Sequence, residues 1–231
     1  MKNLRIEALI LALGLVVLGL LFRSGIALFV DKDRVVAVKG LAEMEVNADK
    51  VIWPLSYKEM GNNPTEIYAQ ISEKNAQIVD FLKQNGVAAN EISVNPPRVS
   101  DRSANEYNNA QFADRYVATS TITVTSSHVD VVRRLMQRQT ELLKRGIAVG
   151  GNDYETGQVS YEFTKLNDIK PKMIEEATKN ARAAAEKFAK DSESSLGKIR
   201  TASQGQFSIE DRDQTTAHIK KVRVVTTIEY S

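Results

Sequence analysis

The chain has 231 residues, with 31 Lys and Arg, 29 Asp and Glu, two His and no Cys. The lack of Cys excludes disulfides, thiol redox chemistry and thiolate metal sites. The first thirty residues hold three of the basic residues and one acidic residue, so the remainder carries 28 of each and is formally neutral. Nucleic-acid binding normally needs a basic surface, so no nucleic-acid partner is predicted.

The N-terminus contains an apolar run that predicts a membrane-directed leader. Residues 8–22 are apolar, and a second apolar patch at 25–30 follows Arg23. As a helix, the first run rises about 22 Å, which is shorter than the ~30 Å hydrocarbon core and typical of a signal peptide. Residues 8–30 together rise about 34 Å, enough for a signal anchor in which Arg23 snorkels to the headgroups.

Two fates of this leader are therefore open. Small residues allow cleavage after Ala27, whereas the apolar character that resumes at Leu28 favours retention as a signal anchor. Lys2 and Arg5 place the N-terminus in the cytoplasm under the positive-inside rule. The predicted location is the cell envelope in both cases. The chain is a single-pass protein of the inner (cytoplasmic) membrane with its C-terminal domain outside the cytoplasm, or it is periplasmic if cleaved near Ala27.

The leader divides the chain into three predicted parts. These are a signal anchor or signal peptide at 1–30, a charged linker at 31–34 and one α+β domain at 35–231. Alternating apolar residues and turn signals predict strands in the domain, which in chain order are 35–38 (ended by Gly40), 51–60, 91–98, 116–125, 157–164, 198–207 and 219–230. The strand at 116–125 presents a row of Thr side chains on one face, which predicts an exposed or hydrogen-bonded sheet face.

Apolar residues at helical spacing predict three helices, at 64–85, 128–145 and 167–190. The first begins with Asn63 as its cap and Pro64 at its first position, and it stops at Gly86. The last has an alanine-rich inward face that predicts close packing on the sheet, with these inward positions: Ile169, Met173, Ala177, Ala181, Ala184 and Phe188.

The predicted fold class is α+β, a mixed and largely antiparallel sheet covered by three helices and preceded by an N-terminal membrane helix. The order of elements also indicates a weak internal repeat of a strand-helix-strand-strand unit. One copy begins with the strand at 51–60 and the other with the strand at 157–164. The helix at 128–145 would join the two copies, with right-handed crossovers.

The sequence carries few chemical motifs, and we predict no catalytic, cofactor-binding or metal-binding residues, no cofactor and no enzymatic activity. His128 and His218 are the only histidines, too few for most zinc sites. No G-x-S-x-G elbow, Walker A loop or dinucleotide fingerprint is present, and Gly150-Gly151 followed by Gly157 lacks phosphate-binding spacing. The cluster Glu210-Asp211-Arg212-Asp213 is better interpreted as a solvated loop than as a calcium site.

Two further groups of polar residues allow more than one interpretation. Lys220, Lys221 and Arg223 are basic, but the last two alternate with Val and are interpreted as the solvated side of a strand. Asp114-Arg115, beside a long polar loop at 100–114, is interpreted as polar contacts at a loop base or at a subunit interface.

Several segments together are typical of one family, namely Val36 to Gly40, Ala48-Asp49-Lys50, Asn85-Gly86-Val87, the strand that begins at Tyr116, the helix from Glu176 to Ala189, and Leu196-Gly197. Over about residues 35–230 the chain resembles the SIMPL domain family, bacterial envelope proteins of largely unknown function. The resemblance implies a periplasmic or membrane-attached α+β domain that tends to form homo-oligomers and is sometimes linked to stress responses. It implies no catalytic residues.

Three hypotheses of function follow. The leading one is a non-enzymatic envelope protein that is tethered through residues 8–30 and self-associates as a homo-oligomer. The alternative is a monomeric periplasmic module that binds an unidentified protein or small molecule through the loops 100–114 and 208–217. The third is a hydrolase that uses carboxylates such as Asp114, Glu210, Asp211 and Asp213.

Overall fold

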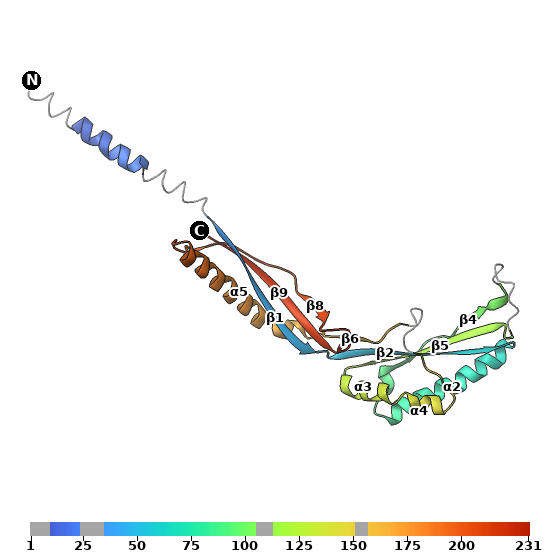
Figure 1. Cartoon of the computed structure of the whole chain (residues 1–231). Helices are drawn as coiled ribbons and strands as arrows, with labels where there is room; N and C mark the ends of the chain where they lie inside the picture. The colour runs from blue at the N-terminus through green and yellow to red at the C-terminus, as the bar shows by residue number, and fades with distance from the viewer. Residues whose placement is uncertain (1–9, 24–34, 105–112, 151–156) are drawn as a thin grey trace, which may run out of the picture. The chain divides into compact units, whose positions relative to one another are not determined.

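The computed structural model describes residues 10–23, 35–104, 113–150 and 157–231 (Figure 1). The chain divides into two compact units, which are described separately. Unit 1 comprises residues 1–44, 167–208 and 222–231, and unit 2 comprises residues 45–166 and 209–221.

The N-terminal apolar run forms a short helix at residues 10–23. Its apolar side chains are exposed all round, for example Leu11 and Phe22, each 68% exposed. In the described part of the chain, no helix combines the length and the apolar character needed to cross a membrane. The patch at 25–30, the cleavage position Ala27, the linker 31–34 and the basic residues Lys2 and Arg5 lie outside the described residues.

Unit 1 contains one helix on one sheet. The sheet has the order β1-β9-β7, with β8 also paired to β9, and its elements are β1 (Val36–Asn47), β7 (Ile199–Gln204), β8 (Ser208–Asp211) and β9 (Ile219–Tyr230). The division between the units falls within β1 and within β9, and all of β8 except Ser208 belongs to unit 2. The helix α5 (Leu166–Asp191) lies along β1 and β9 (Figure 1). A small core of Val38, Ala181, Ala185, Ile228 and Tyr230 lies between helix and sheet.

The predicted close packing of the alanine-rich helix is confirmed, with one change of register. The buried residues of α5 recur every four positions and are Met173, Ala177, Ala181, Ala185 and Ala189. Phe188, predicted to face inward, is 64% exposed. The predicted end of the first strand at Gly40 is also wrong, because β1 continues to Asn47.

Unit 2 is a five-stranded sheet with helices on one face. Its strands follow the order β3-β5-β2-β6, with β4 also paired to β5, and their bounds are β2 (Lys50–Gly61), β3 (Ile92–Val94), β4 (Arg98–Asp101), β5 (Tyr116–Ser126) and β6 (Ser160–Glu162). The helices α2 (Pro64–Gln84), α3 (Val129–Gln137) and α4 (Thr140–Lys144) lie on the same side of this sheet (Figure 1). Trp53, Leu55, Phe81, Leu82 and Ile122 are among the buried core residues between them.

The predicted boundaries of α2 are confirmed. The side chain of Asn63 accepts a hydrogen bond from the main-chain N–H of Thr65, Pro64 is the first helical residue, and Gly86 follows the helix with a φ of 94°. The predicted single helix at 128–145 is instead the pair α3 and α4. At the start of α4, the main-chain N–H groups of Glu141 and Leu142 donate to the carbonyls of Arg138 and Gln139, three residues back. This tighter spacing interrupts the α-helix and seats Leu142 in the core.

The prediction of one mixed sheet is corrected to two antiparallel sheets. In unit 2, β2 and β3 run in the same direction, but β5 lies between them and pairs antiparallel with both. The predicted crossover through α2 therefore joins strands that are not neighbours. The predicted polar loop at 208–217 also begins with a strand, β8.

The proposed strand-helix-strand-strand repeat corresponds in the structure to a unit with one more strand in each copy. A strand, a helix and three strands occur as β2-α2-β3-β4-β5 and again as β6-α5-β7-β8-β9. In each copy the two short strands pair with the long last strand. The long strand β9, however, pairs with β1, whereas β6 pairs antiparallel with β2 in the other sheet.

Candidate functional site

The face of the unit 2 sheet opposite its helices carries an open groove. The strand pairing aligns side chains across this face in rows, because residues directly opposite each other project to the same side. Thr119 on β5 lies opposite Lys58 on β2 and opposite Arg98 on β4. These three residues, Lys58, Thr119 and Arg98, form the central row of the face. The central row therefore places one hydroxyl between two basic residues.

The neighbouring rows add hydroxyls and an apolar edge. On one side of the central row, the hydroxyls of Ser56 and Thr121 are 2.8 Å apart and share a hydrogen bond. On the other side, Val117 lies opposite Ser100 and Met60. The predicted row of Thr side chains on an exposed or hydrogen-bonded face is thus confirmed, and it forms part of the groove.

The groove has a volume of about 920 Å³. It is lined by Lys58, Asn95, Pro96, Pro97, Arg98, Val99, Ser100, Arg102, Val117, Thr119 and Thr121. None of these lining residues is acidic. Sequence reasoning missed this site, although the Thr row was a signal of it, because Lys58 and Arg98 come together only through the strand register.

Beside the groove, an ion pair closes the base of the loop at 100–114. The guanidinium of Arg115 donates through Nε and Nη2 to Asp101, at 2.7 Å for the shortest contact. Hydrogen bonds from Arg115 and Ser103 hold the pKa of Asp101 well below its usual range. The sequence allowed Asp114-Arg115 to make polar contacts at a loop base or at a subunit interface, and this ion pair of Arg115 supports the loop base. Residues 105–112 of this loop lie outside the described residues.

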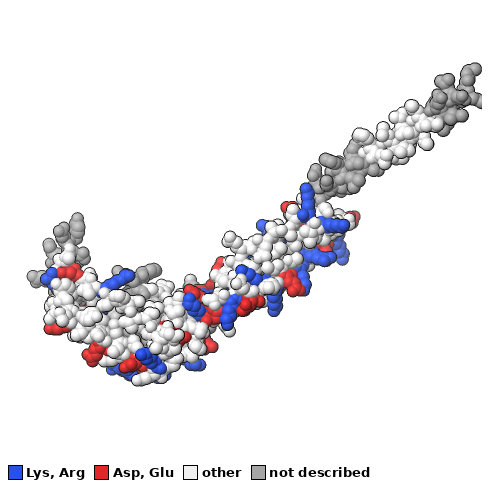
Figure 2. All heavy atoms as spheres, turned by 180° about the vertical axis from the view of Figure 1, so that it is seen from behind, with Lys and Arg blue, Asp and Glu red and all other residues white. Residues whose placement is uncertain are grey.

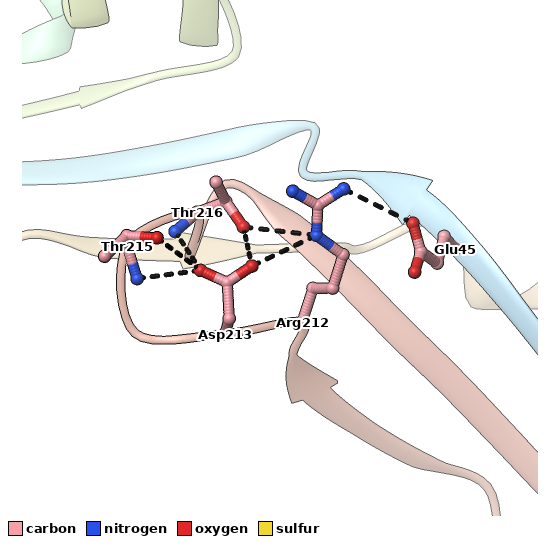
Figure 3. A network of polar contacts seen from close by, with 5 residues as sticks. All are labelled: Glu45, Arg212, Asp213, Thr215 and Thr216. Atoms are coloured by element: carbon pink, nitrogen blue, oxygen red, sulfur yellow. Dashed lines mark hydrogen bonds and ion pairs between the residues drawn. The ribbon is translucent and has the colours of Figure 1, made fainter.

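The other predicted loop holds a polar network rather than a cation-binding arrangement (Figure 3). One carboxylate oxygen of Asp213 accepts hydrogen bonds from the main-chain N–H groups of Thr215 and Thr216, at 2.8 and 2.7 Å, and from the Thr215 hydroxyl. The Nε of Arg212 donates to the other oxygen at 3.1 Å, and its Nη1 lies 3.5 Å from Glu45. Asp211 instead pairs with Lys220. The two aspartates of the predicted acidic cluster therefore pair with different groups.

The two loops of the alternative hypothesis lie at opposite ends of β2. At its start, the N–H of Ala48 donates to the carbonyl of His218, which follows the Asp213 turn. At its end, Asn62 donates to the carbonyl of Ala113 and accepts from the N–H of Arg115. Because each strand residue rises about 3.3 Å, the ends of β2 are roughly 36 Å apart. The described ends of the two loops are therefore separated by the length of β2.

The two histidines occupy different settings. His128 is the N-cap residue before α3 and is exposed. Its Nδ1 is 3.4 Å from Glu91, which also accepts a hydrogen bond from Ser126. Burial alone would raise the pKa of Glu91, but the hydrogen bonds from Ser126 and the Ala88 main chain lower it. The Ser126 hydroxyl contacts the main-chain N–H of His128 at 2.9 Å, so this cluster fixes the helix start.

His218 contacts the ring of Tyr161 edge-on, with 6.1 Å between ring centres. Burial, followed by the positive charges of Arg133 and Arg212, lowers the pKa of His218. Within the described ranges, no three His, Cys, Asp or Glu side chains converge as a metal site would require. Gly150 donates its N–H to the carbonyl of Ser56 at 2.8 Å, which is a structural contact.

The basic residues of β9 divide between two environments. Arg223 is exposed and lies 3.7 Å from Glu43, as expected for the solvated side of a strand. Lys220 is only 7% exposed and pairs with Asp211 on β8. On the face drawn in Figure 2, basic and acidic side chains of unit 1 lie interspersed.

The sheet of unit 1 ends in open strand edges. β1 and β7 are the terminal strands of its order, so the described residues provide no strand partner for their outer edges. All six residues of β7 are exposed, including Ile199 at 55%. Phe188 on α5 is a further exposed apolar side chain. Unpaired edges of this kind are templates for pairing with another chain.

A comparison with family models matches residues 36–228 to SIMPL, described as a protein of unknown function (DUF541). No curated protein matches the chain. The match covers most of the sequence, including the strands of both units.

Proposed function

The chain belongs to the SIMPL family, and from that premise we propose that it is a non-enzymatic protein of the cell envelope that assembles with copies of itself. The family match agrees with the resemblance drawn from the sequence, but the family has no established function. The proposal therefore depends on the structure of unit 1. Its main support is the open edge of β7.

The hydrogen bonds of β7 identify which main-chain groups are available to a second copy. Gly205 donates its N–H to the carbonyl of Val225, so this pair is hydrogen-bonded across the strands. Such pairs alternate along an antiparallel ladder. The register then makes Ser203 and Thr227 a hydrogen-bonded pair, and Ala202, opposite Ile228, directs its N–H and carbonyl to the open edge.

Edge pairing would extend the sheet across two protomers. Pairing of β7 with β7 is two-fold symmetric and gives a dimer, whereas pairing of β7 with β1 is head-to-tail and gives a ring or a filament. The exposed side chains of Ile199 and Phe188 add apolar area on the same unit. A discrete oligomer mass distinguishes the dimer and the ring, which are closed, from the filament, which is open.

The N-terminal helix supports the envelope location. Its side chains at 10–22 are apolar and exposed all round, which suits a lipid environment better than water. We propose that residues 8–30 hold the protein at the membrane with the SIMPL domain outside the cytoplasm. Protease added to spheroplasts should then remove the domain, whereas a domain that stays protected until lysis contradicts this location. The mass of the mature N-terminus distinguishes anchor from cleaved peptide.

Light scattering of the purified full chain in a neutral detergent tests the assembly. The wild type should form a discrete multiple of the 25.7 kDa protomer. Ala202→Pro removes the outward N–H while β7 keeps its bonds to β9, so the oligomer should dissociate. Ala202→Thr keeps the N–H and serves as the matched control. A wild type that is monomeric at micromolar concentration, or an Ala202→Pro oligomer of unchanged mass, contradicts edge pairing.

A further inference from the structure

The groove of unit 2 has the composition of a binding site for an anion. We propose that it binds a small organic anion, in which a phosphate or carboxylate group is joined to an apolar body. This site is separate from the strand edges of unit 1 and does not depend on assembly. The argument uses the central row, the apolar lining and the volume of the groove.

The central row supplies the contacts for the anionic group. Neighbouring strands lie about 4.8 Å apart, so the α-carbons of Lys58 and Arg98 are roughly 10 Å apart, with Thr119 between them. An oxyanion above Thr119 is within reach of both side chains. The planar guanidinium of Arg98 can donate two parallel hydrogen bonds to it, and the Thr119 hydroxyl can donate a third.

Arg98 is the group on which the proposal depends. Its side chain is exposed, and the described residues hold no carboxylate paired with it. Lys58 and Arg102 also line the groove, but each interacts with another group of the chain. They contribute positive charge to the site, whereas Arg98 supplies directed hydrogen bonds.

The remaining lining selects the body of the ligand. Pro96, Pro97 and Val117 provide an apolar surface next to the charged row. Among the described residues, no aromatic side chain lines the groove, so this surface offers an apolar body contact without ring stacking. The volume of about 920 Å³ is in the range of sites for small organic molecules.

Calorimetric titration of the full chain in a neutral detergent tests this proposal with three probes of similar shape. These are phenyl phosphate, phenylacetate and benzyl alcohol. At least one of the two anions should bind, and the ratio of their affinities shows whether the site prefers phosphate or carboxylate. Benzyl alcohol should bind at least about tenfold more weakly than the better anion. Binding should also weaken as salt is added.

Two substitutions locate the binding. Arg98→Gln should weaken anion binding by about tenfold or more, and Thr119→Val should weaken it by a smaller factor. Arg134→Gln removes the same charge from the exposed surface of α3 and should leave binding unchanged. Unchanged melting temperatures show that the variants are folded. Absence of binding by both anions, equal binding of benzyl alcohol, or equal effects of Arg98→Gln and Arg134→Gln would overturn the proposal.

Discussion

Gly40 on β1 lies directly against the main chain of Ala177 on α5. A Cβ added at Gly40 would be 1.9 Å from the carbonyl oxygen of Ala177 and 2.4 Å from the N–H nitrogen of Ala181. No real side chain tolerates such contacts, and the opposing atoms are main chain that cannot rotate away. The missing side chain therefore allows the helix to lie on the strand.

Gly40→Ala should accordingly separate α5 from β1. Overpacking in a core typically costs 1–3 kcal/mol, and a clash with main chain should be at the upper end, about 3 kcal/mol. Denaturant unfolding measures this loss. Gly150→Ala is the control, because nothing lies within 4 Å of its added Cβ. Equal stability of the two variants would show that Gly40 is not a packing requirement.

Thr226 is a position at which a substitution should increase stability. Its hydroxyl is buried and has no hydrogen-bond partner among the described residues, and its side chain points to the same side of β9 as Val224 and Ile228. Thr226→Val replaces the hydroxyl by a methyl group of similar size and removes the cost of desolvation. We expect the free energy of unfolding to rise by about 1 kcal/mol. A loss of stability in the same assay would indicate a partner for this hydroxyl.

The raised pKa of Tyr57 predicts that unit 2 loses stability at alkaline pH. Its hydroxyl contacts Asn75 Oδ1 at 2.8 Å and the carbonyl of Ile71 at 3.0 Å, and burial raises its pKa from 10 to about 12. Since the folded state holds the proton more tightly than the unfolded state, this stabilisation is complete below pH 10. It is lost as the pH rises from 10 to 12.

The melting temperature measured between pH 9 and 12 tests this prediction (a range set by the usual tyrosine pKa of about 10). Tyr57→Phe should be less stable than the wild type at neutral pH, because Asn75 loses a donor. The variant should also lose less stability as the pH rises. Parallel pH curves for the two proteins would assign the alkaline transition to other tyrosines.

The lowered pKa of Asp213 predicts that the turn between β8 and β9 loses stability at acid pH. Hydrogen bonds from the hydroxyls of Thr216 and Thr215 hold its pKa well below the ordinary 3.8. A lowered pKa in the folded state gives stabilisation that is present above the unfolded pKa and is lost as the pH falls through the folded one. Below about pH 4, the amide protons of Thr215 and Thr216 should therefore become less protected.

Hydrogen exchange followed by NMR measures this protection. Asp213→Ala should remove it at every pH, because no acceptor is left for the two amides. Ser194→Ala, in unit 1, changes a side chain far along the chain and should leave the exchange of both amides as in the wild type. Protection that persists in Asp213→Ala would show that the carboxylate does not hold the turn.

Local signals predicted the elements whose boundaries depend on neighbouring residues. Asn63, Pro64 and Gly86 fixed the ends of α2, because a cap, a ring-restricted φ and a left-handed stop act within one turn of the helix. The same logic failed at Gly40. A glycine that permits close packing looks identical in sequence to one that ends a strand, and the difference lies in α5, over a hundred residues away.

The groove illustrates the same limit for the candidate site. The alternation in β5 predicted a row of Thr side chains on an exposed or hydrogen-bonded face, which the structure confirms. No local pattern joins Lys58 to Arg98, since their alignment on either side of Thr119 comes from the registers of two separate strand pairs. The Asp101–Arg115 pair likewise closes a loop whose two ends meet only in the folded unit.

Particular segments of the sequence carried its resemblance to the SIMPL family. The sequence by itself also determined the α+β class, the bounds of α2 and the apolar character of the N-terminal run. These depend on composition and on periodicities of two and 3.6 residues, which short-range sterics and hydrogen bonding impose. Only the tertiary structure decided that there are two sheets, that β1 passes through Gly40 and that basic residues flank a Thr row. Strand pairing and close packing are long-range contacts, and their geometry is set by which segments meet.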